Sequence, residues 1–248
     1  MSNASDNAVE VRRAQSDRTV ILFDARSLPQ ASAALLDASG WPQAQPLAGR
    51  GGRGSATLVR GDFGEGVLRH YRRGGLVGRF VADRYLYLGE PQVRSLREFQ
   101  LLVELQRRGL PAPRPLLAGW RRSGLFYRAD LLTRRIPDSD TLAERLPRGL
   151  DDALWRRVGE TIARFHSQGV FHADLNAHNL LIDADERVWL IDFDRGALRV
   201  PSQDWQRANL RRLRRSLDKL GGVAEVSWAT LLDGYGARMA GSTPGDGG

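Results

Sequence analysis

The chain has 248 residues, of which 42% are hydrophobic and 27% charged, so it can bury a sizeable core and is not a wholly disordered polypeptide. It contains no cysteine, which excludes disulfides, thiolate metal sites, iron–sulfur clusters and a cysteine nucleophile. The 37 basic residues outnumber the 29 acidic ones, and all but Lys219 are arginine. A phosphorylated substrate, an anionic membrane or a nucleic acid would each suit this charge.

Neither a spanning helix nor a secretory signal is visible, so we expect an intracellular protein. Residues 1–18 and 241–248 lack periodicity, and we expect both segments to be disordered. In between, apolar spacing and turn residues predict a strand-rich half followed by a helix-rich half, without internal repeats. The expected strands are 19–23, 56–60, 66–71, 125–132, 180–183 and 188–192, with 56–60 and 66–71 forming a hairpin. The expected helices are 30–38, 95–108, one from the N-cap Asp151 to Gly169, and one carrying Leu210, Leu213, Leu217 and Leu220.

The densest group of polar side chains lies between an expected helix and an expected strand. It has the form His172-x-Asp174-x-x-x-x-Asn179, and Asp192 follows 18 residues beyond Asp174, at the end of the next expected strand. Carboxylate and amide oxygens are the ligands that Mg²⁺ prefers. Three such positions, two on the loop before one expected strand and one at the end of the next, favour a catalytic role over that of merely solvated loop residues.

This pattern resembles the catalytic loop and metal-binding motif of the protein-kinase-like superfamily, including its aminoglycoside-kinase and RIO-type branches. The resemblance implies that Asp174 orients the substrate hydroxyl and accepts its proton, while Asn179 and Asp192 hold Mg²⁺ on the phosphates of ATP. His172 would support the loop. The implied fold is α+β and two-lobed, protein-kinase-like, with a strand-rich N-terminal lobe over 19–135 and a helical C-terminal lobe over 136–240. The segment around Pro137 and Pro147 is interpreted as the linker between the lobes.

Glycines upstream fit a loop that covers phosphates, although a plain turn is the alternative. Gly49, Gly51 and Gly54 have the spacing G-x-G-x-x-G, and without side chains their backbone N–H groups can approach a phosphate. On the strand that follows, the resemblance places Arg69 where kinases carry a lysine. Arginine keeps the charge and can bind phosphate in a bidentate manner, but its geometry differs. A glutamate on the next helix should pair with Arg69; Glu98 is the first choice and Glu104 the second, and either could instead be a surface charge.

The run Val67 to Leu76, together with Asp83-Arg84-Tyr85, narrows the resemblance to the bacterial 3-deoxy-D-manno-octulosonic acid (Kdo) kinases. These small kinases of lipopolysaccharide core assembly are related to the heptose kinases of the same pathway. The resemblance covers about residues 19–220 and implies transfer of the ATP γ-phosphate to the 4-hydroxyl of Kdo on a lipid A precursor. Two features depart from protein kinases. No long activation segment follows Asp192, and Asp194 replaces the usual glycine.

A lipid-linked anionic acceptor would give the basic charge a role at the cytoplasmic face of the inner membrane. We expect an arginine-rich face against that membrane, with apolar residues interleaved. Its members are Arg72, Arg73, Arg79, Arg84, Leu76, Val77, Phe80, Tyr85 and Leu86. An ordinary solvated surface would have a similar pattern.

Other functions stay open at this point. A heptose kinase, or an atypical protein or small-molecule kinase, would use the same catalytic residues. A kinase fold that only binds is suggested by Arg69 and Asp194, but the intact Asp174, Asn179 and Asp192 disfavour it. A nucleic-acid partner is not expected, because it would explain the charge and none of the motifs. The sequence does not determine the oligomeric state.

Overall fold

The structure, a computed structural model, describes residues 8–47, 56–72 and 83–241. Contacts divide the chain into two compact units: unit 1 comprises residues 1–109 and 113–135, and unit 2 comprises residues 110–112 and 136–248. Strands and helices occur in both units, so the fold is mixed α+β, as expected. No helix within the described ranges is long and apolar enough to cross a membrane.

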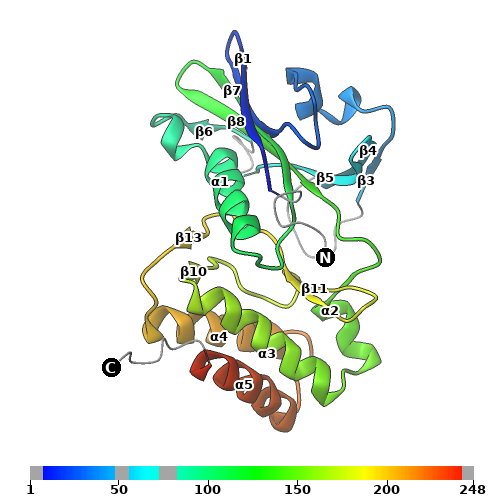
Figure 1. Cartoon of the computed structure of the whole chain (residues 1–248), viewed down its shortest axis with the longest axis vertical. Coiled ribbons are helices and arrows are strands. Elements are labelled where there is room, and N and C mark those ends of the chain that lie inside the picture. The colour runs from blue at the N-terminus through cyan, green and yellow to red at the C-terminus, as the bar shows by residue number, and fades with distance from the viewer. Residues whose placement is uncertain (1–7, 48–55, 73–82, 242–248) are drawn as a thin grey trace. The chain divides into compact units, whose positions relative to one another are not determined.

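Unit 1 is built on an antiparallel eight-stranded sheet of order β1-β2-β7-β8-β5-β4-β3, in which β6 also pairs with β8 (Figure 1). One helix, α1, packs against β7 and β8. Its strands are β1 (Val11–Ser16), β2 (Thr19–Asp24), β3 (Ala44–Pro46), β4 (Ala56–Gly61), β5 (Gly64–His70), β6 (Tyr85–Leu86), β7 (Pro115–Ser123) and β8 (Phe126–Arg134). Its helices are α1 (Arg94–Arg107) and the 3₁₀ turns Ala33–Leu36, Ala38–Gly40 and Glu90–Gln92.

The central strand β7 explains where the core of unit 1 sits. All six residues from Pro115 to Trp120 are buried, as in a strand covered on both faces. Gly119 leaves room for Leu36, because a Cβ at this glycine would lie 2.4 Å from Leu36 Cδ2. Ser95 at the start of α1 donates a hydrogen bond to the Gly119 carbonyl, with a distance of 2.9 Å. A glycine in the middle of the sheet therefore allows close packing at this point.

Unit 2 is mainly helical, with two small antiparallel sheets of order β9-β11-β12 and β10-β13. Helices α3 and α5 lie side by side (Figure 1). Gly159 permits this approach, because a Cβ there would lie 1.9 Å from the Leu231 carbonyl oxygen. The helices are α2 (Leu142–Arg145), the 3₁₀ turn Leu146–Arg148, α3 (Asp152–Ser167), α4 (Gln203–Asp218) and α5 (Glu225–Ala240). The strands are β9 (Asp140–Thr141), β10 (Val170–Phe171), β11 (Leu180–Ile182), β12 (Val188–Leu190) and β13 (Ala197–Leu198).

Most expected elements are present. The predicted hairpin is β4–β5, with Gly61 opposite Gly64, and the Asp151 side chain accepts a hydrogen bond of 2.8 Å from the Leu154 N–H as the N-cap of α3. Three segments differ from the expectation. Residues 11–16 form strand β1 instead of a disordered segment, because pairing with β2 orders them. The expected short helix 30–38 is reduced to a 3₁₀ turn over Ala33–Leu36. The segment interpreted as a linker contains β9 and α2, and α2 begins with a capping box at its N-cap Thr141.

Candidate active site

A buried histidine fixes the loop that carries Asp174. His172 is 1% exposed; its Nδ1 accepts a hydrogen bond of 3.2 Å from the Asp174 N–H, and its Nε2 donates one of 2.9 Å to the Ile191 carbonyl. Burial lowers the pKa of His172, so the ring is neutral at pH 7 and has one nitrogen to donate and one to accept. The expected supporting role of His172 is confirmed.

Helix α4 holds the same loop from another side. The Asn209 side chain donates a hydrogen bond of 3.0 Å to the His172 carbonyl and accepts one of 3.4 Å from the His172 N–H. Ser216 Oγ accepts a hydrogen bond of 3.1 Å from the Ala177 N–H. His166 of α3 also contacts the Asn209 amide oxygen, through Nε2 at 3.3 Å. The loop is thus fixed at both ends before any ligand binds.

Asp174 presents its carboxylate to solvent, with 64% of the side chain exposed. The Asn176 amide donates a hydrogen bond of 3.1 Å to Asp174 Oδ2. The Arg212 guanidinium from α4 lies 3.4 Å from Asp174 Oδ1. An accessible, oriented carboxylate with a neighbouring cation can accept a proton from a hydroxyl beside an anionic group.

The two expected metal ligands flank the β11–β12 pair, with Asn179 immediately before β11 and Asp192 two residues after β12. The Asn179 amide nitrogen donates a hydrogen bond of 2.9 Å to the Asp174 carbonyl, which leaves its oxygen for another partner. The Asn179 carbonyl accepts a hydrogen bond of 3.0 Å from the Ile191 N–H, immediately before Asp192. Asp192 adopts a left-handed φ of 62°, and the next residue, Phe193, is buried against the His172 ring.

These residues fit a magnesium site of the kind completed by a substrate. Mg²⁺ usually takes one or two carboxylates from the protein and its remaining oxygens from phosphates and water. Asn179 and Asp192 supply an amide oxygen and a carboxylate, both hard donors. No group of three or more histidine, aspartate or glutamate side chains that could hold a metal occurs in the described ranges, so the protein donors alone make no complete cage there.

Unit 1 contains the expected ion pair. Arg69 on β5 lies 2.5 Å from Glu98 Oε2 on α1, and Glu98 is 3% exposed. The Tyr71 hydroxyl donates a hydrogen bond to the same oxygen. Glu104 instead pairs at the surface with Arg107 and Arg108, which lower its pKa to about 2. The choice of Glu98 over Glu104 as the partner of Arg69 is therefore confirmed.

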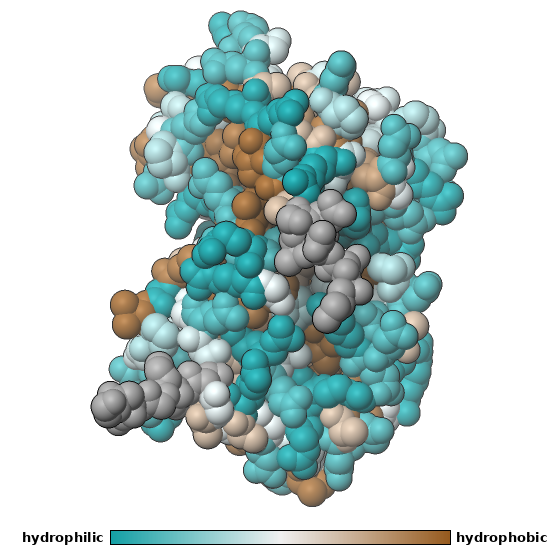
Figure 2. Space-filling model, viewed as in Figure 1, coloured by the Kyte–Doolittle hydropathy of each residue, from teal (hydrophilic) through white to brown (hydrophobic). Residues whose placement is uncertain are grey.

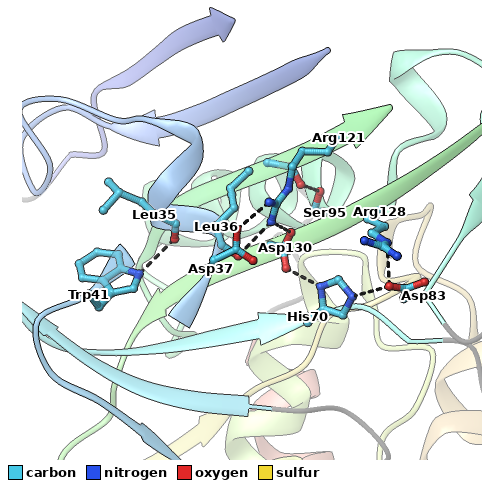
Figure 3. A network of polar contacts seen from close by, with 11 residues as sticks. Leu35, Leu36, Asp37, Trp41, His70, Asp83, Ser95, Arg121, Arg128 and Asp130 are labelled. Atoms are coloured by element: carbon cyan, nitrogen blue, oxygen red, sulfur yellow. Dashed lines mark hydrogen bonds and ion pairs between the residues drawn. The ribbon is translucent and has the colours of Figure 1, made fainter. Parts of the chain in front are cut away.

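A second polar network starts from the neighbouring residue on β5 (Figure 3). His70 Nδ1 donates a hydrogen bond of 2.6 Å to Asp130 Oδ1, and Arg121 Nη2 lies 3.5 Å from the other oxygen of that carboxylate. Asp130 is 1% exposed, and its hydrogen bond raises the pKa of His70. Successive strand residues point to opposite faces, so β5 carries one ion-paired group on each face.

The structure brings the predicted residues together in two sets, Asp174 with Asn179 and Asp192 in unit 2, and Arg69 with Glu98 in unit 1. Gly49, Gly51 and Gly54 lie outside the described residues. Four residues of these two sets were not predicted from the sequence: Arg212, Asn209, Ser216 and Tyr71. Asn209 had a signal, because it is a polar residue on the buried leucine face of α4. Arg212 had no such signal, because the sequence contains many other arginines.

Known proteins match this chain over most of its length. The chain matches the family described as "Lipopolysaccharide kinase (Kdo/WaaP) family" over residues 42–235. A protein of Xanthomonas axonopodis pv. citri (strain 306) named 3-deoxy-D-manno-octulosonic acid kinase is 50% identical over 202 residues, which are 82% of this chain and 81% of that protein. A protein of the same name from Stenotrophomonas maltophilia (strain R551-3) is 48% identical over 206 residues, 83% of each chain.

Proposed function

The chain belongs to the lipopolysaccharide kinase (Kdo/WaaP) family, and from this premise we propose that it phosphorylates the 4-hydroxyl of Kdo on a Kdo-lipid A precursor, using ATP and Mg²⁺, in lipopolysaccharide core biosynthesis. The names of the relatives support the acceptor. One observation carries the reaction: the exposed Asp174 carboxylate stands on a loop that His172 and Asn209 fix in place.

Each residue has a role in this proposal. Asp174 orients the acceptor hydroxyl and takes its proton as the oxygen bonds to the γ-phosphorus, while the bond from that phosphorus to the β–γ bridging oxygen breaks and ADP leaves. Asn179 and Asp192 would hold Mg²⁺, which supplies neutralisation of the phosphate charge when it is bound. The guanidinium of Arg212 lies close enough to Asp174 to balance negative charge at the transferring group.

Arg69 takes the phosphate-binding role of the kinase lysine in this proposal. Glu98 and Tyr71 fix one side of its guanidinium, and 22% of the Arg69 side chain is exposed. A guanidinium has five N–H donors in a rigid fork, so it can bind a phosphate while it keeps its carboxylate partner. Gly49, Gly51 and Gly54 would supply backbone N–H groups to the same phosphates. We assign the strand-rich unit 1 and the helical unit 2 to the two lobes of a kinase-like fold.

Transfer of labelled γ-phosphate from Mg-ATP tests the proposal. Parallel reactions contain Kdo-bearing lipid A precursor, precursor without Kdo, a heptose-bearing core lipid, and a generic protein. We expect label only on the Kdo-bearing lipid, and loss of at least a thousandfold in rate for Asp174→Ala. Asp185→Ala is the matched control, since Asp185 is also an exposed loop aspartate and should keep wild-type activity.

Each contrary result has a distinct meaning. Label on the heptose-bearing lipid would indicate a heptose kinase, and label on the generic protein would indicate an atypical protein kinase. A folded Asp174→Ala variant with wild-type turnover would refute the assignment of the base. Absence of label from every acceptor, with no ATP turnover, would favour a kinase fold that only binds.

We also propose a membrane-facing surface at the β6–β8 edge of unit 1. Leu86 pairs in register with Phe126, and both are exposed, as are Leu88 (72%) and Leu125 (69%). Arg84 is exposed beside them. Adjacent leucines and arginine suit an anionic lipid surface, which combines apolar insertion with charge attraction. Elsewhere, on the face viewed in Figure 2, hydrophilic side chains cover most of the surface.

This surface differs from the one that the sequence predicted. Tyr85 is only 7% exposed, and the Arg94 guanidinium lies 4.9 Å from its ring centroid, so Tyr85 belongs to the interior. Arg73, Leu76, Val77, Arg79 and Phe80 lie outside the described residues.

Co-sedimentation with vesicles tests this surface. We expect binding to phosphatidylglycerol vesicles that weakens with salt, and about tenfold weaker binding for Leu88→Ser with Leu125→Ser. Val200→Ser is the control, because Val200 is 86% exposed on unit 2. Equal binding of all three proteins would refute the assignment.

A further inference from the structure

A row of cations on α4 lies beside the proposed catalytic base. Helical spacing places Arg212, Arg215 and Lys219 on one face of α4, because residues three, four and seven apart share a face. The hydrogen bonds from the catalytic loop to Asn209 and Ser216 hold this helix against the loop. The packing of α4 against the loop therefore fixes where the backbone of this row of cations lies relative to Asp174.

The row and Asp174 line one cavity of about 290 Å³. All of its lining residues belong to unit 2, and besides Asp174 they include Asn176 and His178 of the catalytic loop. Its volume lies just below the range of about 300–1,000 Å³ that is typical of small-molecule sites. A sugar whose hydroxyl reaches Asp174 can therefore place other substituents among these side chains.

The charge of this cavity is only partly balanced. Arg212 contacts Asp174 at 3.4 Å, whereas Arg215 and Lys219 form no ion pair with any residue in the described ranges. Nearby on the same helix, Arg214 is paired with both Asp218 and Glu225. Two cations without a carboxylate partner, beside an exposed base, leave this cavity suited to an anionic ligand.

We propose that Arg215 and Lys219 form the anion subsite of the acceptor and bind the carboxylate of the same sugar whose hydroxyl meets Asp174. The inference rests on the proposed function and names the acceptor group that these two residues recognise. The acid group and the reacting hydroxyl sit on one rigid ring, so binding the first orients the second. The chain's only lysine thereby acquires a specificity role.

A structural role is the competing explanation. Arg215 is in the last turn of α4 and Lys219 is its C-cap, where cations interact favourably with the helix dipole. A dipole role predicts a lower melting temperature on neutralisation and an unchanged Michaelis constant for the acceptor. A carboxylate-binding role predicts an unchanged melting temperature and a higher Michaelis constant for the acceptor.

The experiment measures acceptor and ATP kinetics for Arg215→Gln, Lys219→Gln and the double variant. We expect the KM for the Kdo-bearing acceptor to rise about tenfold in each single variant, with little change in the KM for ATP or in the melting temperature. Arg211→Gln is the matched control, since Arg211 is exposed on α4 but does not line the cavity. It should behave as the wild-type protein.

Two modified acceptors identify the anion. With the Kdo carboxyl group converted to its methyl ester, wild-type protein should show the same loss, and the variants should lose nothing more. With the lipid A phosphates removed, the effect of the variants should persist. A loss that persists with the ester and vanishes with the dephosphorylated lipid would show that the cations bind lipid phosphate, and would overturn the inference.

The outcome also separates this inference from the proposed function. If the wild-type protein phosphorylates the Kdo-bearing acceptor and both single variants keep the wild-type KM for that acceptor, only the proposed anion subsite is overturned. An inactive wild-type protein on that acceptor overturns the proposed function and the subsite together.

Discussion

Replacing Arg69 with alanine should reduce both stability and the use of ATP, for different reasons. The stability effect follows from the position of Glu98, which is 3% exposed and shares one carboxylate oxygen between Arg69 and the Tyr71 hydroxyl. Removing one partner of a fully buried ion pair costs about 3–5 kcal/mol, because a buried charge is left without compensation. Here the Arg69 side chain is 22% exposed and Tyr71 remains, so we expect a loss of about 2 kcal/mol.

A double variant isolates the cause. Glu98→Gln removes the charge that Arg69→Ala leaves unpaired, so the double variant should be about 1 kcal/mol more stable than Arg69→Ala alone. Urea unfolding followed by circular dichroism measures the free energy of unfolding for the wild type, both single variants and the double variant. If the double variant is no more stable than Arg69→Ala, the unpaired carboxylate is not the source of the loss.

Kinetics then test the proposed role in nucleotide binding. Both variants that lack Arg69 should show a KM for ATP raised about tenfold or more, whatever their stability, because a charged contact to phosphate is gone. Arg60→Ala serves as the control, since Arg60 pairs with Glu65 at the surface of the neighbouring strand β4. A KM for ATP that stays at the wild-type value in the double variant would refute the phosphate role of Arg69.

Three further predictions follow from unit 2. Burial lowers the pKa of His166 to about 4 from 6.5, so between these values the unfolded chain binds a proton that the folded chain excludes. The free energy of unfolding should therefore fall by up to about 3 kcal/mol as the pH decreases from 6.5 to 4, and a folded His166→Gln variant should lose most of that slope in denaturant titrations. Gly159→Ala should lower the unfolding free energy by about 3 kcal/mol, because its Cβ would clash with the Leu231 carbonyl; thermal melting measures the loss, and an unchanged melting temperature would contradict the close α3–α5 packing. Asn209→Ala should leave the His172 backbone unsatisfied and lower kcat more than it changes either KM; a wild-type kcat would show that the loop needs no support from α4.

Local motifs were sufficient for the centre of the site. Asp174, Asn179 and Asp192 could be predicted to lie close together, because their spacing is set by one loop and one short hairpin, and no distant contact has to be known. Glu98 was found from helical spacing on α1, since it lies one turn from the buried Leu102. The hairpin β4–β5 was predicted for the same reason, because its turn and register are local.

Elements whose order depends on distant partners were missed. Strand β7 begins at Pro115, the last of three closely spaced prolines, and shows a continuous buried run without alternation, so its pattern is typical of neither an amphipathic strand nor an amphipathic helix. Strand β1 is almost fully exposed and is ordered by its pairing with β2. Helix α5 buries only Thr230, Leu231 and Gly234, which form no apolar stripe.

The sequence by itself determined the family and the candidate catalytic residues, because the identities and short spacings of those residues are encoded locally. Tertiary structure decided which of the many basic residues matter near that chemistry. Arg212 and Lys219 are ordinary surface cations in the sequence, and they line a cavity with Asp174, unlike Arg211, because Asn209 and Ser216 hold their helix against the loop of Asp174. Charge is a property of composition, whereas a binding site requires charges to be held at one place, and only packing provides that.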